Sequence, residues 1–126
     1  MPEFSDLEKL NEPAGIANSI GFWIYHIVDD MLKLSTNSME NFGIKNEVPL
    51  DLVSFKSHIL GIDIPVFLNS FGKWLEGDCS DIMHIRVIDT KKNIKTMQIK
   101  GHARRDEEGN VVQLYGAYID ISNRQN

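Results

Sequence analysis

The chain has 126 residues, of which 42% are hydrophobic and 25% are charged, and its formal net charge is −5. This length and composition predict one soluble globular domain with its own hydrophobic core, which needs no metal or disulfide to fold. The negative charge disfavours a nucleic-acid partner, since the basic pairs at residues 91–92 and 104–105 both lie beside acidic side chains.

The first 14 residues, MPEFSDLEKLNEPA, place Phe4, Leu7 and Leu10 at helical spacing. This pattern predicts either a surface helix with one covered face or a flanking helix that packs on a sheet or on a second copy of the domain. The segment has early acidic residues and no long apolar run, so a signal peptide is not expected. The most apolar stretch, Ile16 to Val28, is too short and too polar to cross a bilayer, so no membrane contact is expected.

Residues 21–35, GFWIYHIVDDMLKLS, predict two strands joined by a turn at residues 28–30. The first strand has two alternating sets of side chains, both largely apolar: Trp23, Tyr25 and Ile27 against Phe22, Ile24 and His26. A strand that is covered on both faces is usually central, so we expect this strand to have a neighbour on each side.

Two short helices are expected next. Asn37 and Glu40 have the spacing of a capping box, and Gly43 suits the position after a helix end, which predicts a helix over residues 38–42. Asp51 can cap a second short helix that extends through His58.

The longest helix is predicted to begin after Asp63 and to end near Gly77, because the proline of Ile64-Pro65 is tolerated in a first helical turn. Its apolar positions form one stripe at the spacing i, i+3, i+4, i+7 and i+11: Ile64, Phe67, Leu68, Phe71 and Leu75. This stripe predicts that the helix covers an apolar surface.

Three strands with clear hairpin turns fill the last third of the chain, at residues 82–89, 94–104 and 111–121. Their turns are KKN at residues 91–93 and DEEGN at residues 106–110, and Asn93 tolerates the left-handed conformation that the first turn needs. The whole order of elements predicts an α+β fold, a five-stranded antiparallel sheet with short helices on one face.

These elements resemble, in order and in residues, a PAS domain of the bacterial sensory-box type, over about Gly15 to Arg124. The family's opening strands are similar to GFWIYHIVDDMLKLS, and its first helix is similar to MENFGI. Its closing strands and C-terminal PAC motif are similar to HIRVIDTKKNIKTMQIKGHARRDEEGNVVQLYGAYIDISNR. The chain departs from the family in three places: the segment from His58 to Asp63 is longer and lacks a proline, Asn93 stands where an Asp-Gly turn is usual, and Met97 replaces a tryptophan.

The resemblance implies a flanking helix at residues 1–14, a PAS domain at residues 15–122 and the start of a linker to an effector domain at residues 123–126. In PAS domains the long helix arches over a concave sheet and leaves a pocket between them. The candidate pocket residues are Tyr25, Phe42, Phe67, Phe71, Ile85, Met97, Ile99 and Tyr118. They are compatible with a small-molecule sensor, or with a ligand-free dimerisation and interaction module whose own side chains fill the pocket.

The resemblance also implies a route for signal output. Asp120-Ile121-Ser122 is similar to the family's exit motif, and the candidate output residues are Asp120, Ser122 and Arg124. Asp120 can accept hydrogen bonds or pair with a cation, and Ser122 can cap a helix that follows. The effectors common in this family are diguanylate cyclases and histidine kinases of two-component systems, and a homodimer is expected to pair through the N-terminal apolar positions.

No haem and no covalently bound flavin are expected, and the ligand itself is not identified by the sequence. PAS domains that bind haem generally use a histidine on the long helix, and residues 64–76 contain none. The blue-light flavin subclass uses a cysteine in an Asn-Cys-Arg motif, which is missing here. The single cysteine, Cys79, is expected to be an incidental thiol, and it fits a reducing cytoplasm.

No catalytic residue and no metal ligand is predicted. The four histidines lack the Cys or carboxylate spacing of a zinc site: His26, His58, His84 and His102. An acid–base pair of the kind used by small α+β isomerases can be drawn from Tyr118 and Asp120. Both residues lie on the exit strand, where the resemblance implies connection rather than catalysis.

Overall fold

The computed structural model describes residues 20–35, 50–89 and 91–122. Its elements in chain order are β1 (Ile20–His26), β2 (Met31–Leu34), α3 (Leu52–Lys56), the 3₁₀ turn η2 (Gly61–Asp63), α4 (Ile64–Leu75), β3 (Met83–Ile88), β4 (Ile94–Arg105) and β5 (Val111–Asp120). The last three strands begin and end within one residue of their predicted bounds. The predicted helices at residues 1–14 and 38–42 lie outside the described residues.

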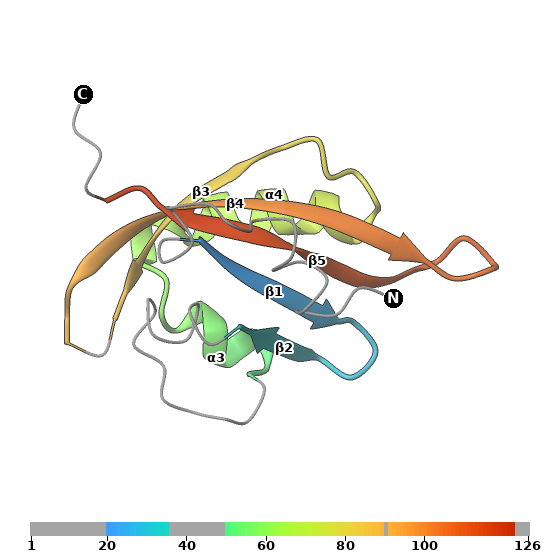
Figure 1. Ribbon diagram of the computed structural model, residues 1–126, viewed down its shortest axis with the longest axis horizontal. Helices are drawn as coiled ribbons and strands as arrows, with labels where there is room; N and C mark the ends of the chain where they lie inside the picture. Colours follow the sequence, from blue (N-terminus) through green and yellow to red (C-terminus); the bar gives the residue numbers. More distant parts are fainter. Residues whose placement is uncertain (1–19, 36–49, 90, 123–126) are drawn as a thin grey trace.

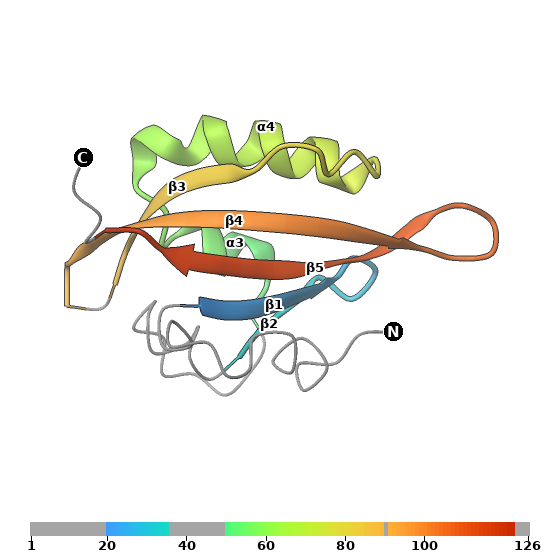
Figure 2. The same ribbon diagram turned by 45° about the horizontal axis from the view of Figure 1, so that its top comes forward.

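The five strands form one antiparallel sheet in the order β2-β1-β5-β4-β3, so the predicted α+β architecture is confirmed (Figure 1). Both α3 and α4 contribute to the core on the sheet face that carries Trp23 and Tyr25, and Figure 2 shows α4 along that face. The last strand, β5, lies in the centre of the sheet. The first strand, β1, is an interior strand as predicted, and Phe22 and Ile24 on its other face are also buried.

Helix α4 covers an apolar surface as predicted, and Phe67 and Phe71 of the predicted stripe are buried, but the buried face is rotated toward Ser70 and Trp74. The buried side chains are Phe67, Ser70, Phe71 and Trp74, whereas Leu68 is 50% exposed and Leu75 is 37% exposed. Successive helical residues are about 100° apart, so Leu68 and Leu75 both lie on one side of the buried arc that is centred on Phe67 and Trp74. The predicted inward stripe is therefore wrong at Leu68 and Leu75, because the large indole of Trp74 determines which face turns inward.

Trp74 can turn inward because a glycine of β4, Gly101, lies beneath its ring. Gly101 of β4 is opposite Gly116 of β5, and Gly116 is opposite Trp23 of β1. A Cβ atom at Gly101 would lie 2.8 Å from Cε3 of Trp74, so the indole rests directly on the strand backbone. The rings of Trp74 and Trp23 stack with centroids 5.7 Å apart and an angle of 12° between their planes.

The start of α4 is tied to β3 by Asp63, whose carboxylate does not cap the helix. It accepts three hydrogen bonds from Arg86, each 2.8 Å long, from the backbone N–H and from Nε and Nη2 of the guanidinium. These hydrogen bonds hold the pKa of Asp63 below its usual value, against the opposing effect of burial. Leu60 N–H also donates to the carbonyl of Arg86, so the segment before α4 follows the outer edge of β3.

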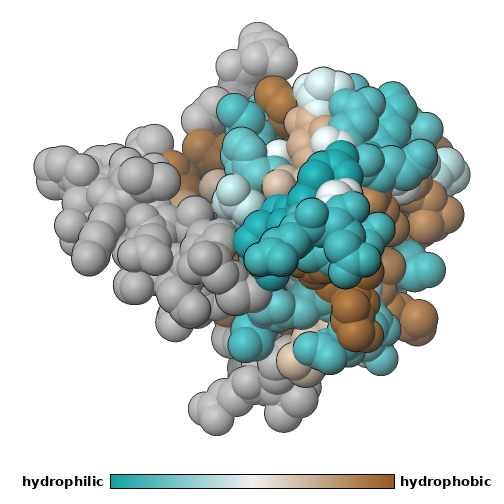
Figure 3. All heavy atoms as spheres, turned by 90° about the vertical axis from the view of Figure 1, so that its right-hand side faces the viewer, coloured by the Kyte–Doolittle hydropathy of each residue, from teal (hydrophilic) through white to brown (hydrophobic). Residues whose placement is uncertain are grey.

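The hairpin turns are formed mainly by aspartates that accept backbone N–H groups. Asp106 accepts from Glu108 and Asn110 at 2.9 Å each, and the turn at residues 106–110 is a hydrophilic tip in the end-on view of Figure 3. In the β3–β4 turn the left-handed residue is Lys92, with φ of 70°, and not Asn93. The prediction for Asn93 is therefore wrong, because its N–H donates instead to the carboxylate of Asp89.

The contact between Trp74 and the sheet leads to a stability prediction. We expect Gly101→Ala to lower the free energy of unfolding by about 1–3 kcal/mol, because the added methyl group collides with the indole and α4 must shift. Gly72→Ala is the control, since nothing beyond the adjoining backbone of its own helix lies within 4 Å of that Cβ position and alanine favours a helix by about 0.5–1 kcal/mol. Urea unfolding of both variants checks this, and equal stability of Gly101→Ala and the parent chain would contradict it.

Candidate functional site

A cavity lies between the helices and the covered face of the sheet. The space open to the centre of a water-sized sphere is about 40 Å³, and the lining side chains are Trp23, Tyr25, Leu32, Leu34, Leu52, Phe55, Phe67, Phe71, Trp74, Met83, Ile99 and Tyr118. Five of the candidate pocket residues are among them: Tyr25, Phe67, Phe71, Ile99 and Tyr118. Two others, Ile85 and Met97, are buried in the core without lining the cavity, and Phe42 lies outside the described residues.

Sequence reasoning missed seven of the lining residues. On β1 the alternation that places Tyr25 inward also places Trp23 inward, so this signal was present in the sequence. Trp74 lies seven positions after Phe67, which also puts it on the same helical face. Leu52 and Phe55 belong to α3, where the predicted cap is confirmed, since Asp51 accepts from the backbone N–H of Ser54 at 2.7 Å. Their approach to the cavity depends on how α3 packs, which no local pattern predicts.

The lining is apolar, and two of its side chains carry unpaired donors. The indole nitrogens of Trp23 and Trp74 are buried and have no hydrogen-bond partner among the described residues. A buried donor without a partner costs about 1–3 kcal/mol. No Asp, Glu, Lys, Arg or His side chain lines the cavity. The cavity can therefore receive a neutral molecule, and it has no group that would compensate a charge.

One edge of the cavity is held by Tyr25 and Asp30. The hydroxyl of Tyr25 donates to Asp30 at 2.7 Å, and the backbone N–H of Leu52 donates to the same carboxylate oxygen at 3.1 Å. Asp30 adopts the left-handed conformation, with φ of 51°, in the turn between β1 and β2. Burial, and then the hydrogen bond to the Asp30 carboxylate, raise the pKa of Tyr25 well above its usual value. Asp30 thus joins the β1–β2 turn to the start of α3.

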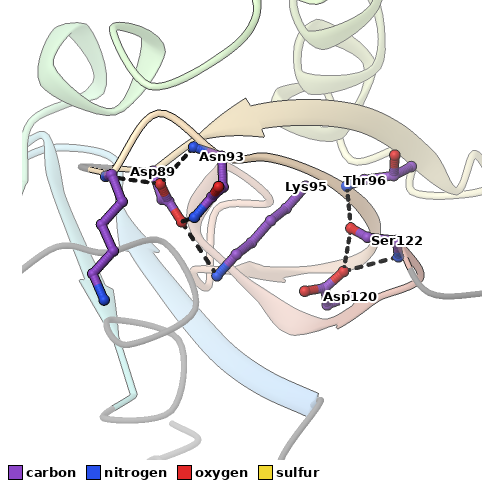
Figure 4. Close-up of polar contacts among 7 residues, drawn as sticks. Asp89, Asn93, Lys95, Thr96, Asp120 and Ser122 are labelled. Carbon is purple, nitrogen blue, oxygen red and sulfur yellow. Dashed lines mark hydrogen bonds and ion pairs between the residues drawn. The ribbon is translucent and has the colours of Figure 1, made fainter.

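The exit from the sheet carries a second polar network, shown in Figure 4. The backbone N–H of Ser122 donates to the carboxylate of Asp120 at 2.9 Å, and the Ser122 hydroxyl donates to the same oxygen. That hydroxyl in turn accepts the backbone N–H of Thr96 at 2.7 Å, while Ile121 N–H donates to the carbonyl of Thr96. Two of the three candidate output residues are therefore joined to the start of β4. The third, Arg124, lies outside the described residues.

The same part of β4 is bound to the preceding turn. Asp89 accepts the backbone N–H groups of Lys91 and Asn93, and the ammonium group of Lys95 lies 3.7 Å from its carboxylate (Figure 4). These hydrogen bonds, led by the one from Asn93, lower the pKa of Asp89, and burial opposes them. Lys95 and Thr96 are neighbours, so the turn and the exit meet on two consecutive residues of β4.

The metal site, the acid–base pair and the reactive thiol considered in the sequence analysis are compared with the structure next. Within the described ranges no group of three or more His, Cys, Asp or Glu side chains could hold a metal ion. Asp120 does not line the cavity, so it forms no acid–base pair there with Tyr118. Burial raises the pKa of the Cys79 thiol, which disfavours the thiolate form. Among the described helices, none is both long and apolar enough to span a bilayer.

No protein-family model matches the sequence, and no curated protein matches it. Solved structures match its fold. A sensory box histidine kinase/response regulator from Burkholderia thailandensis is 18% identical, with a TM-score of 0.72 over 85% of this chain and 80% of that chain. The N-terminal domain of a diguanylate cyclase with PAS/PAC sensor from Marinobacter aquaeolei is 16% identical, with a TM-score of 0.72 over 82% and 95%. A light-oxygen-voltage domain studied with a flavin analogue is 22% identical, with a TM-score of 0.67 over 93% and 85%. These similarities show that the chain has the PAS fold.

The bond between Tyr25 and Asp30 leads to a prediction on pH. The pKa of Tyr25 is higher in the folded chain than in the unfolded chain, so its stabilising contribution is complete below about pH 10 and is lost as the pH rises further. We expect Tyr25→Phe to cost about 1 kcal/mol at neutral pH and to reduce the loss of stability above about pH 10.

Urea unfolding at neutral and alkaline pH measures both effects. Tyr115→Phe is the matched control, because this tyrosine lies on the opposite face of β5 and leaves the bond between Tyr25 and Asp30 intact. A Tyr25→Phe variant with the parent chain's alkaline stability profile would contradict the prediction.

Proposed function

We propose that this chain is a sensory and signal-relay domain of a bacterial signalling protein, which binds a small molecule in its cavity and regulates an effector that follows the last strand. The PAS fold supports this proposal, since similar structures are described as sensory box and PAS/PAC sensor proteins. The apolar cavity supports the sensory part, and the hydrogen-bonded exit supports the relay part. The domain itself is proposed to be regulatory and not enzymatic.

The observation that carries the proposal is that β5 contains both a residue that lines the cavity and the residue that holds the exit from the sheet. Tyr118 lines the cavity and is opposite Ile99, which also lines it. Two residues later, Asp120 holds Ser122 at the exit, opposite Met97. A ligand that displaces Tyr118 therefore acts on the strand whose end positions the exit, without a separate moving element. A free-energy difference of about 1 kcal/mol at the exit shifts a balanced two-state output several-fold.

The proposed effector is a diguanylate cyclase or a histidine kinase. Both types of protein occur among the structures with the same fold. A homodimer through Phe4, Leu7 and Leu10 remains a prediction, because these residues lie outside the described residues. A cytoplasmic location is proposed because the chain has a single cysteine, which fits a reducing compartment.

A ligand-free relay module is the second candidate, and the volume of the cavity favours it. A space of about 40 Å³ leaves little room for the larger cofactors of sensory domains, such as flavin or haem. In this case the side chains of α4 and the sheet would fill the core, and the domain would act through dimerisation and its exit network alone.

The exit network leads to a prediction on regulation. In the full-length protein, Asp120→Ala is expected to change effector activity at least about threefold, while costing the domain about 1 kcal/mol of stability or less. Asp106→Ala is the matched control, because Asp106 also accepts backbone N–H groups but at the far end of β5. The measurements are effector activity and urea unfolding. Regulation that changes equally in both variants, or in neither, would remove Asp120 from the output route.

The two candidate functions differ in whether the freshly purified protein is expected to bind a small molecule. A sensor is expected to retain a small molecule that native mass spectrometry detects, or to gain thermal stability with a metabolite, whereas a ligand-free relay does neither. In both cases we expect no absorption from haem or flavin, since α4 has no histidine and the flavin cysteine motif is missing. A Soret band or a persistent flavin spectrum would contradict this expectation.

A further inference from the structure

The wall of the cavity offers no hydrogen-bonding group to a molecule inside it. The described lining residues are all aliphatic, aromatic or methionine, and none of their polar atoms is accessible from the cavity. The indole nitrogens of Trp23 and Trp74 are buried, so they do not reach it. The hydroxyl of Tyr25 donates to Asp30 at 2.7 Å, and Asp30 does not line the cavity. An occupant therefore meets an apolar surface alone.

This wall excludes charged and polar occupants. A buried charge needs a counter-charge, and no described lining residue carries one. A carbonyl or hydroxyl group that enters such a site loses its hydrogen bonds with water and gains none in return. Water itself is excluded for the same reason, since a buried water molecule needs about two to four polar partners.

The volume defines the size of the occupant. One water molecule needs roughly 10–15 Å³ of space, and the cavity offers about 40 Å³. This corresponds to about three or four non-hydrogen atoms. When an apolar cavity is empty, its lining atoms lack contact partners on one side. A molecule that fills it restores these dispersion contacts, so an apolar occupant of the right size stabilises the fold.

The aromatic rings of the lining hold one another in place around this space. The rings of Phe67 and Phe71 stack with centroids 5.1 Å apart, and the ring of Tyr25 meets that of Phe71 at 5.5 Å in an edge-on arrangement. The two tryptophan rings are stacked as well. Met83 is the one unbranched, flexible side chain among the described lining residues. The shape of the cavity is therefore set mainly by rings that cannot easily turn to fill it.

We propose that the cavity binds a compact, neutral hydrocarbon of about four carbon atoms, such as a short alkene, and that it discriminates against oxygen-containing molecules of the same shape. This inference rests on the proposed function, since it names the class of molecule that the same cavity senses. The apolar wall selects the carbon body and the volume limits its size. The lack of accessible polar atoms in the described lining rejects the ketone and the acid of the same shape.

Three probes with the same four-atom frame test this class: isobutene, acetone and acetate. Isobutene presents carbon alone, acetone replaces the methylene group with oxygen, and acetate adds a negative charge. Each probe is titrated into the protein, and nuclear magnetic resonance follows the methyl groups and aromatic rings of the lining. Trp23 and Trp74 are the only tryptophans of the chain and both line the cavity, so their ring signals report on it directly.

We expect isobutene to cause saturable shifts of the lining methyl resonances and nuclear Overhauser contacts with at least one tryptophan ring. Acetone is expected to bind at least about tenfold more weakly, because its oxygen stays unpaired, and acetate is expected to cause no change at the cavity. Absence of isobutene binding, or equal affinity for isobutene and acetone, would overturn the proposal. Isobutene contacts found only at exposed apolar residues such as Ile62 and Leu68 would also overturn it, because the hydrocarbon would then lie on the surface.

A matched pair of variants at Ile99 supplies a second measurement. Ile99 is 7% exposed and lines the cavity from β4. Ile99→Val and Ile99→Thr leave side chains of nearly the same shape, but only threonine brings a hydroxyl group to the wall. We expect the ratio of isobutene affinity to acetone affinity to be at least about fivefold lower in Ile99→Thr than in Ile99→Val, because the hydroxyl can donate to the oxygen of acetone. Equal ratios in the two variants would overturn the assignment of the apolar wall as the source of selectivity. If Ile99→Thr does not fold, the titration of the parent protein still decides.

Failure of this inference is distinct from failure of the proposed function. If isobutene does not bind but a screen of other metabolites raises the thermal stability, the hydrocarbon class is wrong and the sensor remains. If neither isobutene nor any metabolite binds and Asp120→Ala leaves regulation unchanged, the proposed function fails together with the inference.

Discussion

The contact between the indole of Trp74 and the bare backbone at Gly101 is the constraint on which the rest of this structure depends. A side chain at Gly101 would occupy the position of the ring, so a glycine on β4 lets the helix come close to the sheet. That contact determines which face of α4 turns inward and brings Trp74 onto Trp23. It therefore also positions the two tryptophan rings that line the cavity.

The order of the strands connects this cavity to the end of the domain. Because the sheet has the order β2-β1-β5-β4-β3, the last strand lies in its centre and reaches the exit directly from beneath the helices. The exit is then held from the side by Thr96 of the neighbouring strand. Tyr118 and Asp120 are two residues apart on this strand, so a displacement of Tyr118 would act on the backbone that also carries Asp120. The sensory and relay parts of the proposed function share this single element.

The strands and their turns could be predicted from the sequence because their signals are local. Alternation at Met83, Ile85 and Val87 needs only neighbouring residues, and the predicted bounds differ from the observed ones by one residue at most. The candidate pocket was predicted in part for the same reason, since inward positions on a strand follow from alternation. Ile85 and Met97 do face inward, but they are covered by other core side chains, and only packing determines which inward residues reach the cavity.

The sequence by itself determined the class of fold, the position of the long helix and the places of the turns between the last strands, because periodicity, capping and turn chemistry act over a few residues. Only the tertiary structure decided the rotation of α4, since Leu68 and Trp74 are both apolar and the choice between them depends on a glycine about thirty residues away. It also decided that Asp63 binds Arg86 rather than capping its own helix. Long-range complementarity of shape and charge has no period in the sequence, and it is this complementarity that made the cavity.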